Sequence, residues 1–199
     1  MPLVRNGAAV QDPWTAVTTA DQLDRSGPLL VTLDLWRTHR DRLAGRTGPL
    51  GLLLASDQSP ALVADDLDRF DLIALEFPKF TDGRAYSHAR LLRERFGFTG
   101  EVRAVGHVLR DQIAFMLRCG FNALDLDERA ATGWDTATTA FSAWYQPATD
   151  GQAPIPARRR HAAQARAAAA VIRSAPVRPE PARQPDPVGS AVCAATWAY

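Results

Sequence analysis

Five basic side chains near the ends of two short apolar segments are the residues of this chain best suited to bind an anion. They are Lys79, Arg84, Arg90, Arg103 and Arg110. Guanidinium groups hold oxyanions and carboxylates through paired hydrogen bonds, whereas a lysine ammonium acts as a point charge. The alternative is that these side chains form surface ion pairs with nearby carboxylates such as Asp82, Glu94 and Asp111.

Two predicted helix starts lie beside these cations. Asp82-Gly83-Arg84 opens one helix, in which Asp82 is the predicted N-terminal cap, and Gly106 precedes the next. The free N–H groups of a helix start and the positive end of its dipole favour a bound anion. The sequence therefore predicts a small-anion site at residues 79–84 and 106–112. Its predicted members are Lys79, Asp82, Gly83, Arg84, Tyr86, Ser87, Arg90, Gly106, Arg110 and Asp111.

Motifs that would identify a reaction are missing from the sequence. There is no GxGxxG or GxxxxGK[ST] phosphate motif, no paired Cys/His spacing for zinc and no GxSxG elbow. Two cysteines are too few for a Cys-ligated iron–sulfur cluster, and Cys119 follows an apolar helix as a core thiol would. His107 can act as an acid or base, or can simply be a polar residue of a first helical turn. We assign no catalytic residue, no metal and no cofactor from the sequence.

The elements that position these residues are short apolar strands alternating with helices. Asn6-Gly7 predicts a type I′ turn in an N-terminal β-hairpin. The pattern predicts an α/β fold with a mainly parallel five-stranded sheet. An open three-layer sandwich is the favoured architecture and a partial βα barrel is the alternative. The five predicted strands cover residues 29–33, 51–55, 72–77, 101–105 and 121–126, and residues 15–28 are predicted to be a connector.

Helix boundaries can also be read from the sequence. Ser59-Pro60 is a typical helix start, and Gly97 and Gly120 are expected to end helices in the left-handed conformation. Further helices are predicted over residues 34–43, over residues 108–118 and from Trp134 to Tyr145.

Connectivity brings the two cationic loops together in this scheme. The strands at 72–77 and 101–105 are joined by one helix, and such crossovers are right-handed and make the strands parallel. Parallel strands end at the same edge of a sheet. We therefore expect Arg84 and Arg110 to converge on one anion at this edge.

Composition bounds the domain organisation and the kinds of partner. With 199 residues, we expect one α/β domain over 1–147 and a tail over 148–199 that is rich in Ala, Arg and Pro and largely disordered. Within the tail, a weak helix is predicted to about Ser174, followed by disorder from Pro176 to Pro187. A net charge of +1 argues against nucleic-acid binding. Two cysteines and the lack of a signal peptide or long apolar run predict a cytoplasmic protein without membrane contact.

The central run FPKFTDGRAYSHARLLRERFGFTGEVRAVGHVLRDQ, residues 77–112, resembles a bacterial family, domain-of-unknown-function family 934. The ending Cys119-Gly120-Phe121 and the hairpin followed by Asp12 and Trp14 are also similar to the family, so the resemblance extends over residues 3–147. The chain departs from the family at His107, where Asp or Asn is more frequent.

The resemblance implies a role in sulfur metabolism, because members of the family are predicted to be oxidoreductase-like proteins of sulfite reduction. Multi-electron reduction of sulfite requires redox cofactors, and the sequence shows no motif for one. We therefore expect an accessory protein of assimilatory sulfite reduction that binds sulfite or a related anion. Two alternatives remain open: an oxidoreductase subunit whose cofactor site has no motif, and a non-catalytic docking protein for sulfite reductase.

Overall fold

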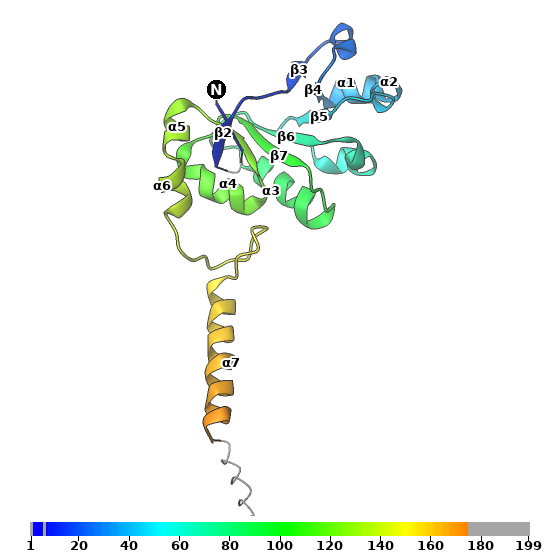
Figure 1. Cartoon of the computed structure of the whole chain (residues 1–199). Coiled ribbons are helices and arrows are strands. Elements are labelled where there is room, and N and C mark those ends of the chain that lie inside the picture. The colour runs from blue at the N-terminus through cyan, green and yellow to red at the C-terminus, as the bar shows by residue number, and fades with distance from the viewer. Residues whose placement is uncertain (1, 6, 175–199) are drawn as a thin grey trace, which may run out of the picture. The chain divides into compact units, whose positions relative to one another are not determined.

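The computed structural model describes residues 2–5 and 7–174, and its strands form one sheet (Figure 1). The sheet has eight strands in the order β2-β1-β8-β7-β6-β5-β4-β3. The strands are β1 Leu3–Arg5, β2 Ala8–Val10, β3 Thr15–Val17, β4 Leu29–Thr32, β5 Leu50–Leu54, β6 Leu72–Phe77, β7 Glu101–Gly106 and β8 Ala123–Asp125.

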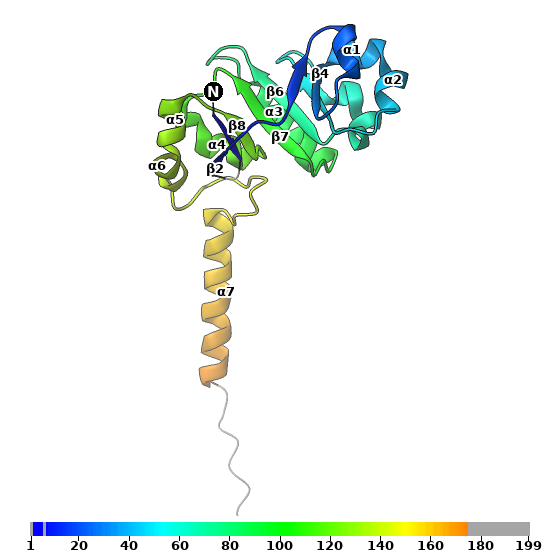
Figure 2. The same cartoon turned by 45° about the horizontal axis from the view of Figure 1, so that its top comes forward.

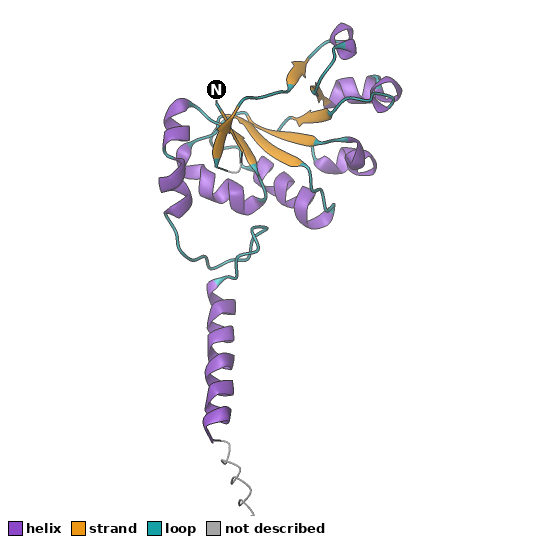
Figure 3. Ribbon diagram, in the orientation of Figure 1, coloured by secondary structure: helices purple, strands orange, loops and turns teal. Residues whose placement is uncertain are grey.

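From β3 to β8, helices connect successive strands (Figure 3). The α-helices are α1 Leu33–Thr38, α2 Arg40–Ala44, α3 Arg84–Arg90, α4 Ile113–Cys119, α5 Glu128–Thr132, α6 Trp134–Thr139 and α7 Ile155–Ser174. The 3-10 helices are η1 Ala20–Asp24, η2 Pro60–Arg69 and η4 Arg110–Gln112, and a π-helical turn, η3, covers Leu91–Arg95. By its contacts the chain divides into Met1–Arg158 and Arg159–Tyr199.

The parallel α/β prediction is confirmed in outline, but the sheet has eight strands and not five. Both hairpin strands join it, because β1 pairs antiparallel with β8 through Leu3 and Asp125. The predicted connector at 15–28 contains β3, which pairs with β4. Runs of three residues are too short to show an alternating pattern, so they cannot be recognised as strands before their partners are known.

The predicted three-layer sandwich is wrong. The sheet is curled into a half-barrel (Figure 2), which corresponds to the alternative prediction of a partial βα barrel. From β4 to β8 each strand lies beside its predecessor, so every crossover steps in the same direction. Right-handed crossovers that all step one way place their helices on one face of the sheet. A sandwich needs a reversal of strand order to cover both faces.

The short connection between β2 and β3 explains the curl. These strands are the two edges of the sheet, yet only residues 11–14 separate them. Eight flat strands would span about 34 Å at about 4.8 Å per spacing. The five steps from Val10 to Thr15 reach at most about 17 Å. The sheet must therefore curl, and residues 11–14, hereafter the strap, cross its inner face (Figure 2).

The two faces of the sheet carry different buried side chains. Ile73, Leu75 and Val102 belong to the main hydrophobic cluster on the outer face, together with helix residues such as Leu92 and Met116. The alternate positions face inward and include four fully or nearly buried residues, Leu3, Leu72, Ala74 and Ala123. The inner face is thus a second, smaller buried layer beneath the strap.

Helix predictions are partly confirmed. Gly97 and Gly120 adopt positive φ angles of 64° and 108°, as expected for helix ends. The segment predicted at 34–43 breaks at His39, and the last domain helix ends at Thr139 and not at Tyr145. The predicted Ala/Arg-rich helix is present as α7, whereas Pro176 to Pro187 lie outside the described residues. The proposed boundary at residue 147 stays a prediction.

Candidate functional site

The loops after β6 and β7 lie side by side at one edge of the sheet, as predicted. The strands are parallel with Phe77 opposite Gly106, and the His107 N–H donates to the Phe77 carbonyl oxygen at 2.7 Å. Gly106 has a φ of 92°, and a Cβ there would lie 2.6 Å from that oxygen. Glycine is required at this position because any side chain would strain the backbone and separate the loops.

Arg84 is held in a fixed orientation at this edge. Its Nε donates to Asp82 Oδ1 at 3.0 Å, and its Nη2 donates to Asp82 Oδ2 at 2.7 Å and to Ser56 Oγ at 2.8 Å. The hydrogen bonds from Arg84 hold the pKa of the Asp82 carboxyl well below its usual range, and Asp82 in turn raises the pKa of Arg84. The predicted cap is displaced by one position, because Gly83 occupies the cap position of α3, but the Asp82 side chain serves the helix start as predicted. The carboxylate accepts the Arg84 N–H and orients its side chain.

Arg110 lies on the other side of the two loops. A Cβ on Gly133 would collide with Arg110 Nε and Cδ, so this arginine packs over the junction of α5 and α6. Together with Asp111 it lines an open pocket of about 490 Å³ beside α6. Arg84 instead reaches Ser56, just after β5. Because β5 and β8 lie on opposite sides of the β6–β7 pair, the expected convergence of Arg84 and Arg110 does not occur.

The other predicted members of the site have mixed surroundings. Lys79 is exposed and has no ion-pair partner among the residues that the structure describes. Arg90 pairs with Glu94 one helical turn away, at 2.8 Å. Ser87 is exposed beside that pair, and His107 is exposed after β7. Of the predicted cations, Lys79 and Arg84 are therefore the two that can still bind an anion together, at the loop after β6.

Tyr86 is a packing residue. Its ring lies edge-on to Phe77 at 5.1 Å and contacts Phe115 at 4.9 Å between ring centroids. Burial raises the pKa of the Tyr86 hydroxyl to about 12. A phenol that is so hard to ionise and that packs in this way is suited to supporting α3 on the sheet, and not to acting as a base.

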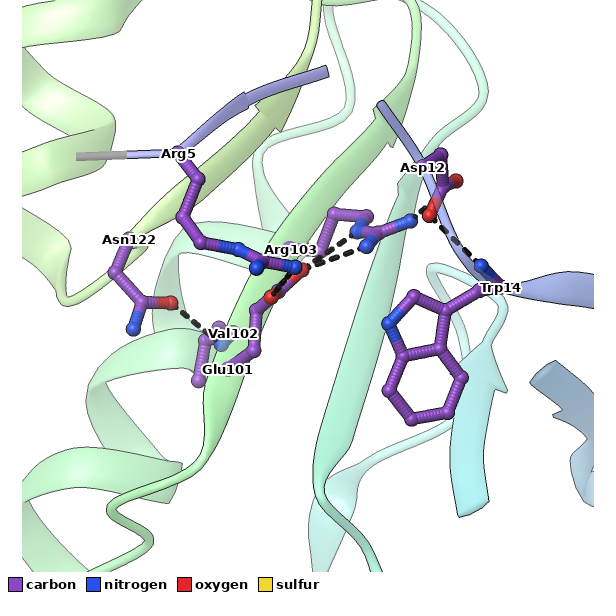
Figure 4. A network of polar contacts seen from close by, with 7 residues as sticks. All are labelled: Arg5, Asp12, Trp14, Glu101, Val102, Arg103 and Asn122. Atoms are coloured by element: carbon purple, nitrogen blue, oxygen red, sulfur yellow. Dashed lines mark hydrogen bonds and ion pairs between the residues drawn. The ribbon is translucent and has the colours of Figure 1, made fainter. Parts of the chain in front are cut away.

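Arg103 lies on the inner face of the sheet, away from the loops, and is only 2% exposed (Figure 4). Its Nη1 donates to Asp12 Oδ2 of the strap at 2.8 Å, and its Nε donates to Glu101 Oε1 at 2.8 Å. Glu101 also pairs with Arg5 at 2.6 Å. The other Asp12 oxygen accepts the Trp14 N–H at 3.1 Å.

This network fastens the strap to the sheet. Asp12 ties it to β7, and Trp14 covers Gly51 of β5, where an added Cβ would lie 3.1 Å from the indole. Removing a partner from a buried ion pair is unfavourable because it leaves charge uncompensated in the interior. Buried Arg103 therefore depends on its two carboxylate partners. No pattern in the sequence indicates the network, since Asp12 and Arg103 are 91 residues apart.

Within the described part of the chain, no group of three His, Cys, Asp or Glu side chains is arranged to hold a metal ion. In the same residues, no helix combines the length and apolar character needed to cross a bilayer.

Comparison with known proteins supports the family resemblance. The model of a family described as bacterial protein of unknown function (DUF934) matches residues 51–156. This match includes β6, α3, β7 and α4, and therefore both loops of the carboxyl edge. No curated protein and no solved structure shows a significant match.

Proposed function

Because the chain belongs to the bacterial family of unknown function DUF934, we propose that it is an accessory protein of assimilatory sulfite reduction in the cytoplasm. In this proposal it binds sulfite or a related small oxyanion at the loop after β6. The connection to sulfite comes from what the family resemblance implies.

The fixed orientation of Arg84 is the observation that carries the binding proposal. Asp82 and Ser56 occupy Nε and Nη2, and Nη1 has no hydrogen-bond partner in the described part of the chain. Lys79 lies five residues earlier in the same loop. An arginine that is already ordered loses less conformational entropy when it binds a ligand.

The charges of the loop limit how tightly it can bind. Lys79 and Arg84 contribute two positive charges and Asp82 one negative charge, which leaves one net positive charge. Each hydrogen bond to a charged group contributes about 1.5–3 kcal/mol. Two such bonds contribute about 3–6 kcal/mol together, and a dissociation constant of about 1 mM corresponds to about −4 kcal/mol, so we expect binding no tighter than the millimolar range.

Sulfite titration of the full chain tests this proposal. Calorimetry at constant ionic strength, with chloride as the reference anion, should give saturable binding for the wild type. Lys79→Ala and Arg84→Ala should each weaken it about tenfold, the effect of losing one charge-assisted bond. Asp82→Asn should strengthen binding because it removes the repelling carboxylate. Arg95→Ala is the matched control, since Arg95 is exposed and lies at the end of η3, whereas Arg84 begins α3.

Equal responses of Arg84→Ala and Arg95→Ala would contradict the anion site. Weakened binding in the control as well would show that sulfite responds only to the overall charge of the protein.

Docking to sulfite reductase is a second candidate function, and the exposure of Phe80 favours it. This phenylalanine follows Lys79 and is 53% exposed. Aromatic residues are enriched in the cores of protein interfaces. Pull-down with purified sulfite reductase should then succeed without sulfite and fail with Phe80→Ser. Retention of the reductase by Phe80→Ser would argue against docking through this loop.

A further inference from the structure

A pocket of about 380 Å³ lies at the C-terminal ends of α3 and α4, away from the carboxyl edge of the sheet. Three aromatic side chains line it: Phe115 from α4, and Trp144 and Tyr145 from the segment after α6. Arg118 and Arg90 add positive charge to the wall. This volume lies within the usual range for small-molecule sites, which are mostly apolar with a few polar groups.

Arg118 is the polar group of the pocket that is held most firmly. It is 7% exposed, and its guanidinium lies 4.2 Å from the centre of the Trp144 ring. Its Nη2 donates to the Gln146 carbonyl oxygen at 2.7 Å. Thr149 also contacts the backbone of Arg118, donating to its carbonyl oxygen from both N and Oγ1. The segment that follows α6 therefore fixes this side chain in place.

One nitrogen of this guanidinium lacks a hydrogen bond. Nη1 of Arg118 is buried and has no hydrogen-bond partner in the described residues. Its ion-pair partner is Asp150, whose Oδ2 lies 3.5 Å away and is itself buried without a hydrogen bond. The ion pair compensates the charge of Arg118 but leaves the hydrogen bond of Nη1 unmade, and a ligand oxygen that displaced Asp150 would supply that bond.

The rest of the pocket wall is apolar. Phe115 and Tyr145 are 51% and 68% exposed, so both rings have surface available for a ligand. Burial raises the pKa of the Cys119 thiol to about 11, so this group is uncharged at neutral pH. The apolar part of a ligand would gain free energy by leaving water to pack against such a wall.

We propose that this pocket binds a small aromatic carboxylate, with the carboxylate on Arg118 and the ring against Phe115 and Tyr145. The arginine supplies a charged donor, and the aromatic wall supplies contact area for a flat ring. Asp150 competes with the ligand for Nη1. The site is independent of the proposed sulfite site, since it shares neither Lys79 nor Arg84.

Calorimetric titration of the full chain with three probes tests the pairing of charge and ring. Benzoate has both, benzamide has the ring without the charge, and acetate has the charge without the ring. Benzoate should bind at least about tenfold more tightly than either of the others, the ratio expected for one charge-assisted bond. Equal affinity for benzoate and benzamide, or no binding of benzoate, would overturn the proposal.

Variants that leave buried Arg118 in place locate the site, with Phe115 changed as an exposed wall residue and Asp150 changed only from carboxylate to amide. Phe115→Ser should weaken benzoate binding about tenfold, and Asp150→Asn should strengthen it by removing the competing charge. Leu62→Ser is the control, because Leu62 is 50% exposed and lies on η2 outside this pocket. Equal affinities of Phe115→Ser and Leu62→Ser, or weaker binding by Asp150→Asn, would refute the assignment.

Discussion

Removing the strap carboxylate by Asp12→Ala should destabilise the whole half-barrel. Arg103 would lose one of its two carboxylate partners while its side chain stays buried. The strap would lose its bond to β7 and the acceptor for the Trp14 N–H. Because the strap connects the two edge strands, the change acts on the closure of the sheet and not on one local contact.

The size of the effect follows from what remains in place. Breaking a fully buried ion pair costs about 3–5 kcal/mol. Glu101 still compensates Arg103, and Asp12 itself is 44% exposed, so the lower scale of about 2 kcal/mol for one charge-assisted hydrogen bond applies. For a chain of this length, such a loss lowers the melting temperature by about 4–8 °C.

Urea unfolding followed by circular dichroism measures the loss, and a double-mutant cycle assigns it. In an Arg103→Leu background, Asp12→Ala should cost clearly less, because only the hydrogen bond from the Trp14 N–H is then lost. Asp68→Ala serves as the control, since Asp68 is exposed and its nearest cation, Arg69, is 3.9 Å away. If Asp12→Ala costs no more than Asp68→Ala, or the same in both backgrounds, the ion pair does not hold the strap.

Three further predictions concern the inner face and the core. Gly51→Ala should lower the free energy of unfolding by about 1–3 kcal/mol, because its Cβ would lie 3.1 Å from the Trp14 indole in a filled layer. An unchanged midpoint of chemical unfolding would mean that the strap moves freely. Burial raises the pKa of Asp125, so folding disfavours its charged form and stability is lost as pH rises through the acid range. Asp125→Asn should therefore stabilise the protein at pH 7 and have little effect near pH 3, and a uniform effect would exclude ionisation as the cause. In a Cys193→Ser background, Cys119 should react with maleimide only after unfolding, because burial raises its pKa to about 11, and fast labelling of the folded protein would contradict this.

The local chemistry of the sequence was sufficient to predict the parallel core of the fold. Apolar runs separated by helix signals identified the strands from β4 to β8, and one connecting helix was enough to make β6 and β7 parallel. The shared edge of their loops follows from that connectivity. Glycine positions such as Gly97 and Gly120 were also predictable, because the left-handed conformation excludes most other residues.

The direction of side chains at the edge was decided by tertiary contacts. Sequence spacing brought Arg84 and Arg110 to the same edge, but Ser56 draws one toward β5 and Gly133 leaves room for the other beside α6. Those neighbours come from distant parts of the chain. Spacing along a helix or strand therefore gives the position of a backbone and not the partner that its side chain finds.

The curl of the sheet and its inner layer belong to the tertiary structure alone. No local pattern shows that three residues at Thr15–Val17 pair with β4, or that Asp12 lies over Arg103. The short strap has a fixed reach, and the sheet must bend until its two edges come within that reach. This constraint arises only when both edges are formed, which is why a sequence that specified the strands left the half-barrel undetermined.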